Sequence, residues 1–177
     1  MAVLFSNMDW VSLEPYLDDC QAYAQAVNEL KSGYKSSRYL HNNPHYIGAL
    51  AECIFADQFG LSRNWNVRYQ GDDGHDFLLN GWKIDIKACT YWRYPDLKEF
   101  PNVCQSPDIY VLAALDLNRH RGRLVGFCSA YRLFLTPPSD YRGLGLRYWI
   151  SGDSLCTDWS LLDTWTLMCT PPLAKIA

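Results

Sequence analysis

The strongest local signal in the chain is the dipeptide Asn80-Gly81, which separates two runs of alternating residues, 75–79 and 82–87. Such a dipeptide tolerates the positive φ angles of a two-residue loop and joins antiparallel strands as a β-hairpin. A loop of two residues also fixes the register of the strands. The expected cross-strand pairs are Leu79–Trp82, Leu78–Lys83, Phe77–Ile84 and Asp76–Asp85.

Strand alternation divides the side chains of this hairpin between two chemically different faces. The apolar face, which we expect to pack on a helix, comprises Phe77, Leu79, Trp82, Ile84, Ile86 and Ala88. The opposite face comprises Asp76, Leu78, Lys83, Asp85 and Lys87. Directly opposed carboxylates cost up to ~1 kcal/mol when they are exposed.

The opposed carboxylates of Asp76 and Asp85 therefore need compensation. Lys87 would neutralise one charge, and a divalent cation with oxygen ligands would neutralise the rest. A proton shared by the two carboxyl groups would serve as well. The alternative is that this face is simply the solvated side of a hairpin.

A well-delimited helix precedes the hairpin. Asn43 is a capping residue, Pro44 suits the first turn and Gly60 suits the end, so the sequence predicts a helix that ends at Phe59. Its expected buried residues are Ile47, Leu50, Ala51, Ile54 and Phe55. Glu52 lies on another face, one turn from Gly48 and one turn from Ala56. Small neighbours allow close packing, so we expect Glu52 to lie against another element.

The rest of the chain predicts one domain, residues 1–177. We expect a first helix from Ser12 to Gly33, a short helix from Ser129 to Leu135, and a long connection over residues 90–106 with at most a helical turn near 96–100. Further strands are expected over residues 65–69, 109–115, 123–128 and 146–150. An irregular acidic tail with Trp159 and Trp165 follows.

The order of Glu52 on a helix, Asp76 on a strand and Asp85-Ile86-Lys87 on the next strand resembles the PD-(D/E)xK nuclease superfamily, in its small prokaryotic and phage members. The resemblance covers residues 44–150 and implies the restriction-endonuclease-like fold: an α/β domain whose mixed central sheet is flanked by helices, with the amino-terminal helix and the carboxy-terminal tail as additions. His75 stands where many members have proline, and residues 89–106 lack a signal for the family's usual helix.

The resemblance implies metal-assisted hydrolysis of phosphodiester bonds in DNA. Asp76, Asp85 and the main-chain carbonyl of Ile86 would bind Mg²⁺ or Mn²⁺, and Glu52 would join them directly or through water. Lys87 would orient or help to deprotonate the attacking water. We expect an endonuclease, since no ATP-binding or processivity module is evident. The alternatives are a structure-specific nuclease or junction resolvase acting as a homodimer, and a module of the same fold that binds nucleic acid without cutting it.

Several residues outside this set suit contacts with nucleic acid. His45 lies near the start of the Glu52 helix, where a phosphate can bind, although a solvent-facing histidine is the simpler interpretation. Trp92 and Arg93 can stack on unpaired bases or pack at the rim of the core. Arg121 lies in a basic turn that can hold a phosphate backbone or form a solvated hairpin tip.

Charge and cysteine content narrow the protein class. The net charge of −3 argues against a protein that coats nucleic acid, but residues 31–150 hold 15 of the 16 basic and 11 of the 19 acidic residues. Seven cysteines without a Cys-x-x-Cys pair favour reduced thiols over disulfides or zinc. The chain shows no apolar run of membrane-spanning length and no signal peptide. We therefore expect a cytoplasmic protein that does not enter a membrane.

Overall fold

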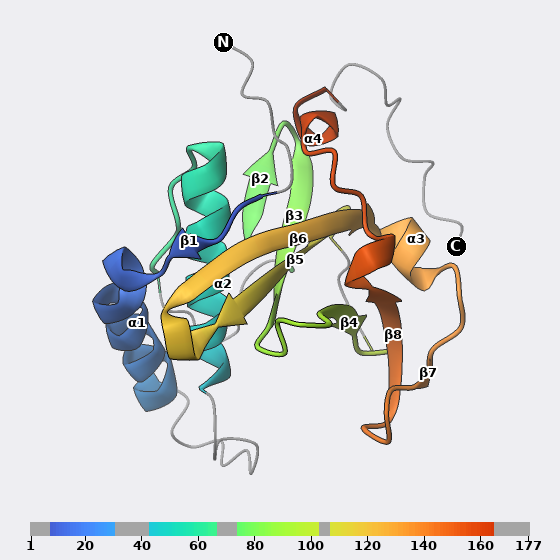
Figure 1. Ribbon diagram of the computed structural model, residues 1–177, viewed down its shortest axis with the longest axis horizontal. Coiled ribbons are helices and arrows are strands. Elements are labelled where there is room, and N and C mark those ends of the chain that lie inside the picture. The colour runs from blue at the N-terminus through green and yellow to red at the C-terminus, as the bar shows by residue number, and fades with distance from the viewer. Residues whose placement is uncertain (1–7, 31–42, 67–73, 103–106, 165–177) are drawn as a thin grey trace.

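The computed structural model describes residues 8–30, 43–66, 74–102 and 107–164, and it is a mixed α/β structure (Figure 1). Its larger sheet has five strands in the order β1-β6-β5-β3-β2. These are β1 (Val11–Ser12), β6 (Arg121–Ser129), β5 (Ile109–Asp116), β3 (Trp82–Cys89) and β2 (Phe77–Leu79). β3 and β5 run parallel, and the other neighbouring strands run antiparallel.

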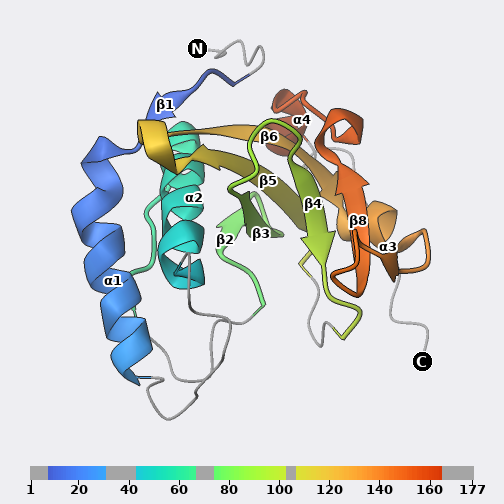
Figure 2. The same cartoon turned by 60° about the horizontal axis from the view of Figure 1, so that its bottom comes forward.

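A smaller sheet lies on one side of the five-stranded sheet (Figure 2). It has the order β4-β8-β7, with β4 (Asp96–Glu99), β8 (Leu146–Ser151) and β7 (Ser139–Asp140). The helices α1 (Leu17–Leu30) and α2 (Pro44–Phe59) lie on the other side, and α3 (Ala130–Phe134) packs near β8. The remaining described elements are α4 (Ser160–Thr164) and the 3₁₀ helices Glu14–Tyr16, Leu117–Arg119 and Gly152–Ser154.

The hairpin has the predicted turn and register. Asn80 and Gly81 have φ angles of 52° and 85°, and the pairs Leu79–Trp82, Leu78–Lys83 and Phe77–Ile84 are all formed. The apolar face of the hairpin belongs to the main core, where Phe77 packs on Phe55 of α2 with ring centroids 5.2 Å apart. The predicted packing of this face on a helix is therefore confirmed.

The predicted second helix is also confirmed. The side chain of Asn43 accepts a hydrogen bond from the backbone N–H of His45 at 3.1 Å, and Pro44 occupies the first turn. Gly60 ends α2 in the left-handed conformation. The buried residues of α2 include the predicted Leu50, Ala51, Ile54 and Phe55, while Ile47 is half-buried.

Three expectations about the elements need correction. The first α-helix begins at Leu17, because Ser12 lies in β1 and its hydroxyl accepts from the backbone N–H of Glu14 in a 3₁₀ turn. The connection over residues 90–106 contains the strand β4 instead of a helical turn. The tail is partly ordered, since Trp159 packs on Phe127 in the core. Most of the expected strand at residues 65–69 and all of Trp165 lie outside the described residues.

Two apolar clusters hold these layers together. The larger joins α1 and α2 to one face of the five-stranded sheet. The smaller lies on the opposite face and includes Leu97 of β4, Leu112 of β5 and Leu133 of α3. The second face of β3 is therefore covered in part by the smaller sheet. In the part of the chain described here, no helix is long and apolar enough to cross a membrane.

Candidate active site

β3 presents Asp85 and Lys87 on the face of the large sheet that meets the smaller sheet. Ile84 and Ile86 alternate with them and are buried in the main core. Cys89, on the same face as Lys87, belongs to the smaller cluster. The side chains of Asp85 and Lys87 are 18% and 29% exposed. The two charges thus lie at the border of a packed layer, within reach of solvent.

Asp76 reaches this segment in a way that differs from the expected Asp76–Asp85 pair. β2 begins at Phe77, and the backbone N–H of Asp76 donates to the carbonyl of Ile84 at 2.8 Å, one residue out of register. The backbone N–H of Ile86 donates to Asp76 Oδ2 at 2.7 Å. The short aspartate side chain thus replaces a backbone acceptor at the end of the hairpin. Its carboxylate is held directly beside the segment Asp85-Ile86-Lys87.

Lys87 forms two ion pairs. Its Nζ lies 2.8 Å from Asp85 Oδ2 and 2.7 Å from Glu99 Oε2. Burial opposes the charge of the ammonium group, but the attraction and hydrogen bonds of the two carboxylates outweigh burial and raise the pKa of Lys87 above its ordinary value. Lys87 is therefore a firmly protonated ammonium group at neutral pH.

Glu99 is a residue of this site that the sequence analysis missed. Its side chain is 9% exposed, and its Oε1 accepts from the backbone N–H of Phe100 at 2.7 Å. Leu97 and Glu99 alternate on β4, so both face the large sheet. The sequence carried one signal for this strand, the spacing of two residues between Leu97 and Glu99. Pro95 and Pro101, which flank residues 96–99, favoured a loop instead.

β4 is held in place on its other face through Asp96. Asp96 Oδ2 accepts from the hydroxyl of Tyr141 at 2.7 Å and from Nη2 of Arg142 at 2.9 Å. Burial and the hydrogen bond to Asp96 raise the pKa of Tyr141 to about 12. These two contacts hold β4 in place, and β4 carries the Glu99 that pairs with Lys87.

Glu52 lies where α2, α1 and the segment after α2 meet. Its Oε2 is 2.7 Å from Nε of Arg63, an ion-pair distance without the alignment of a hydrogen bond. The side chain of Arg63 is only 3% exposed, and its guanidinium carbon lies 3.9 Å from the ring centroid of Trp65 and 4.3 Å from that of Tyr23. Glu52 therefore supplies counter-charge to a buried cation. Its predicted part in a metal site stays a prediction.

The donor chemistry of the site suits a hard divalent cation. Asp76, Asp85 and Glu99 carry three negative charges against the one positive charge of Lys87, which leaves two negative charges in excess. Mg²⁺ commonly binds through one or two carboxylates, with water and substrate oxygens completing the shell. Among the described residues, no three Asp, Glu, His or Cys side chains lie close enough together to hold an ion. The oxygen donors at this segment of β3 are the carboxylates of Asp76 and Asp85 and the carbonyl of Ile86, so a cation held there would take its remaining ligands from water or substrate.

The structure brings together three of the four predicted nucleic-acid contacts. Arg121 lies with its guanidinium carbon 5.8 Å from the ring centroid of Trp92, and Arg93 lies 5.3 Å from the same ring. Trp10 packs edge-on against Trp92 with centroids 5.8 Å apart. His45 lies on α2, which packs on the opposite face of the large sheet.

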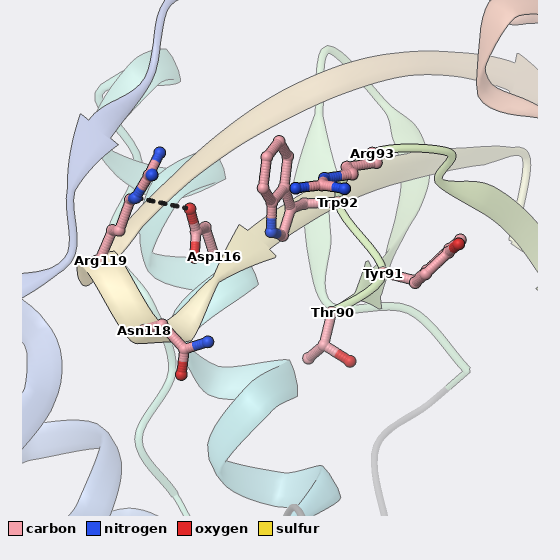
Figure 3. A pocket seen from close by; sticks show the side chains of 7 residues that line it. All are labelled: Thr90, Tyr91, Trp92, Arg93, Asp116, Asn118 and Arg119. Carbon is pink, nitrogen blue, oxygen red and sulfur yellow. Dashed lines mark ion pairs between the residues drawn. The ribbon is translucent and has the colours of Figure 1, made fainter.

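A pocket of about 350 Å³ adjoins this cluster (Figure 3). It is lined by Thr90, Tyr91, Trp92, Arg93, Asp116, Asn118 and Arg119. Asp116 pairs with Arg121 at 3.2 Å and with Arg119 at 4.0 Å. We call these lining residues the Trp92 pocket.

Comparison with protein-family models, with curated proteins and with solved structures finds no match for this chain. Functional assignment therefore depends on the residues and their geometry.

Proposed function

We propose that this protein is a metal-dependent deoxyribonuclease that hydrolyses phosphodiester bonds, with the PD-(D/E)xK arrangement of Asp76, Asp85 and Lys87. The observation that carries the proposal is the 2.7 Å hydrogen bond from the backbone N–H of Ile86 to Asp76 Oδ2. It holds a carboxylate from outside the strand beside the two charged residues that flank Ile86. Asp85 and Lys87 in turn form an ion pair on one face of β3.

The residues have distinct roles in this proposal. Asp76 and Asp85, with the carbonyl of Ile86, would hold Mg²⁺ or Mn²⁺, which lowers the pKa of bound water and neutralises charge on the phosphate. Lys87 is protonated, so it stabilises negative charge on the phosphate and orients the attacking water instead of removing its proton. Glu99 positions the ammonium group of Lys87 through their ion pair. In the reaction, the water oxygen bonds to phosphorus and releases a proton to bulk solvent, the bond to the leaving oxygen breaks, and that oxygen takes up a proton from solvent.

Positive charge near the site favours a nucleic-acid substrate. Arg93, Arg119, Arg121 and Arg123 lie around Trp10 and Trp92, and Asp116 offsets only part of their charge. Arginine side chains bind phosphate oxygens and also stack on bases. Within this proposal we favour an endonuclease, which would nick a closed circular plasmid that offers no free end.

The buried thiols favour a reducing compartment such as the cytoplasm. Cys20, Cys53, Cys89, Cys128 and Cys156 are free in the structure, and the first four are buried. Cys20 and Cys53 lie with their sulfur atoms 3.7 Å apart and unlinked. The remaining cysteines, Cys104 and Cys169, lie outside the described residues.

The direct test is cleavage of a supercoiled plasmid with Mg²⁺ or Mn²⁺. We expect nicked and linear products, complete inhibition by a chelator, and loss of cleavage in Lys87→Ala and in Asp85→Asn. Lys83→Ala, which removes an exposed lysine of the same strand, is the matched control and should cleave like the wild type. Equal cleavage by wild type, Lys87→Ala and Asp85→Asn would refute the assigned site.

The same assay separates the alternatives. Cleavage of four-way or branched DNA without nicking of plasmid, together with a dimer in solution, would identify a structure-specific nuclease. Binding of DNA without cleavage under any divalent metal would identify a non-catalytic binding module.

A further inference from the structure

The Trp92 pocket lies on the same face of the large sheet as Lys87. In the parallel ladder of β3 and β5, Asp85 is paired with Tyr110 and Lys87 with Leu112, and paired residues point to the same face. Tyr110, Leu112 and Asp116 are separated by even numbers of residues along β5, so Asp116 also points to that face. Asp116 lines the pocket.

The pocket is also close to the candidate active site along the chain. β3 ends at Cys89, and Thr90 is the first lining residue. Thr90 is the third residue after Lys87, and three steps along an extended chain correspond to about 10 Å. A polynucleotide strand bound at Lys87 can therefore extend into the pocket.

The lining of the pocket suits a nucleobase. The indole ring of Trp92 borders it, and Asn118, which also lines it, carries both a hydrogen-bond donor and an acceptor (Figure 3). A volume of about 350 Å³ lies in the range of small-molecule sites and is large enough for one heterocycle but not for a double helix.

Arg93 and Arg119 line the pocket together with Asp116, and two further arginines lie beside it around Trp10, so positive charge is available for the phosphates on either side of a base. The guanidinium carbon of Arg121 lies 4.5 Å from the ring centroid of Trp10, and Arg123 lies 5.2 Å from the same ring. Arg93 flanks Trp92, and the side chain of Arg119 is 66% exposed at the pocket edge. Aromatic rings that alternate with arginines form the usual platform for single-stranded nucleic acid.

We infer that the Trp92 pocket binds an unpaired base of the DNA substrate, with Trp92 stacking on the base, so that the protein selects DNA with single-stranded character next to the cleaved bond. This inference rests on the proposed nuclease function, because it assigns a subsite to that function's substrate.

The test is equilibrium binding in the presence of a chelator, which separates binding from cleavage. Fluorescence anisotropy would compare a labelled 20-nucleotide DNA single strand with the blunt duplex of the same sequence. We expect the single strand to bind at least ten-fold more tightly than the duplex and to quench tryptophan fluorescence. Equal affinity for the two DNAs would overturn the inference.

Variants at Trp92 test the stacking. Trp92→Leu keeps apolar volume without a flat ring, so it should weaken single-strand binding about ten-fold. Trp92→Phe keeps a ring and should weaken single-strand binding less. The affinity for the duplex should change less than two-fold in both variants. Tyr131→Ala removes an aromatic side chain that is 77% exposed on α3 and serves as the control. Wild-type affinity in Trp92→Leu would overturn the inference, as would equal losses in the leucine and phenylalanine variants.

The outcome for the pocket is distinguishable from the outcome for the nuclease. Trp92-dependent binding without cleavage under any metal would support the pocket and refute the proposed function. Plasmid cleavage together with single-strand binding that does not depend on Trp92 would support the nuclease and refute the base-binding pocket. Tighter binding of an RNA strand than of the DNA strand would support a base site and move the substrate from DNA to RNA.

Discussion

The Nζ of Lys87 lies 2.7 Å from Oε2 of Glu99 and so joins the five-stranded sheet to the smaller sheet. Lys87 also pairs with Asp85 on its own strand. The central charge of the candidate site is thus held by one carboxylate from each sheet. A substitution that displaces Glu99 is therefore expected to displace the ammonium group of Lys87 as well. Glu99 can have this effect without touching the substrate.

We predict that Glu99→Gln lowers the rate of DNA cleavage about 10–100-fold, since loss of an outer carboxylate commonly costs that much in activity. The substitution keeps the shape of the side chain but removes the charge that positions Lys87. Initial rates of plasmid nicking would measure the effect, and Glu29→Gln, at an exposed residue of α1, is the control. An unchanged rate in Glu99→Gln would show that the ion pair has no part in catalysis.

We predict that Lys87→Ala reduces the free energy of unfolding at pH 8 by about 2 kcal/mol, because Asp85 and Glu99 are then left partly buried without their cation. Removal of one of the two carboxylates as well, in the double variant Lys87→Ala with Glu99→Gln, should restore part of the loss because less negative charge is left uncompensated. Urea unfolding of the wild type and both variants at pH 8 would measure it. A loss that is as large in the double variant as in Lys87→Ala would contradict this explanation.

Glu52 is predicted to stabilise the fold through Arg63. Glu52→Gln should reduce the free energy of unfolding by about 3 kcal/mol, since it leaves a buried guanidinium group without its carboxylate. The double variant Glu52→Gln with Arg63→Met should regain part of this loss, because the uncompensated charge is removed as well. Chemical denaturation of the two single variants and the double variant gives the coupling. Additive losses would argue that the pair is not coupled.

Stability at alkaline pH is predicted to depend on Tyr141. Its pKa is about 12 in the folded protein against 10.0 ordinarily, so the unfolded chain loses this proton first as the pH rises. The stabilisation is complete below pH 10 and is lost as the pH rises to about 12. Between pH 9 and pH 11, the free energy of unfolding should fall less steeply in Tyr141→Phe than in the wild type. The exposed control Tyr131→Phe should follow the wild type, and the same slope in all three proteins would contradict the assignment.

The elements that local chemistry determines were predictable from the sequence. Asn80 and Gly81 specify a turn that few other dipeptides can form, and Asn43, Pro44 and Gly60 specify both ends of α2. In each case the signal and the structure that it predicts lie within a few residues of each other.

The parts that were missed depend on residues far apart in the chain. β4 has Leu97 as its only apolar residue, and its partner strand β8 lies about fifty residues later, so the signal from Leu97 and Glu99 was too short to outweigh the flanking prolines. The predicted Asp76–Asp85 pair was wrong because the carboxylate of Asp76 accepts from a backbone N–H, a choice that alternation does not encode. The partner of Glu52 is Arg63, in a segment without regular structure.

The most direct test of the central claim is the anomalous difference density of a crystal soaked in Mn²⁺. We predict one strong peak within coordination distance of carboxylate oxygens of Asp76 and Asp85 and of the carbonyl oxygen of Ile86, and no such peak in crystals of Asp85→Asn. A peak elsewhere in the molecule, or none at Asp76 and Asp85 at saturating Mn²⁺, would contradict the proposed metal-dependent nuclease.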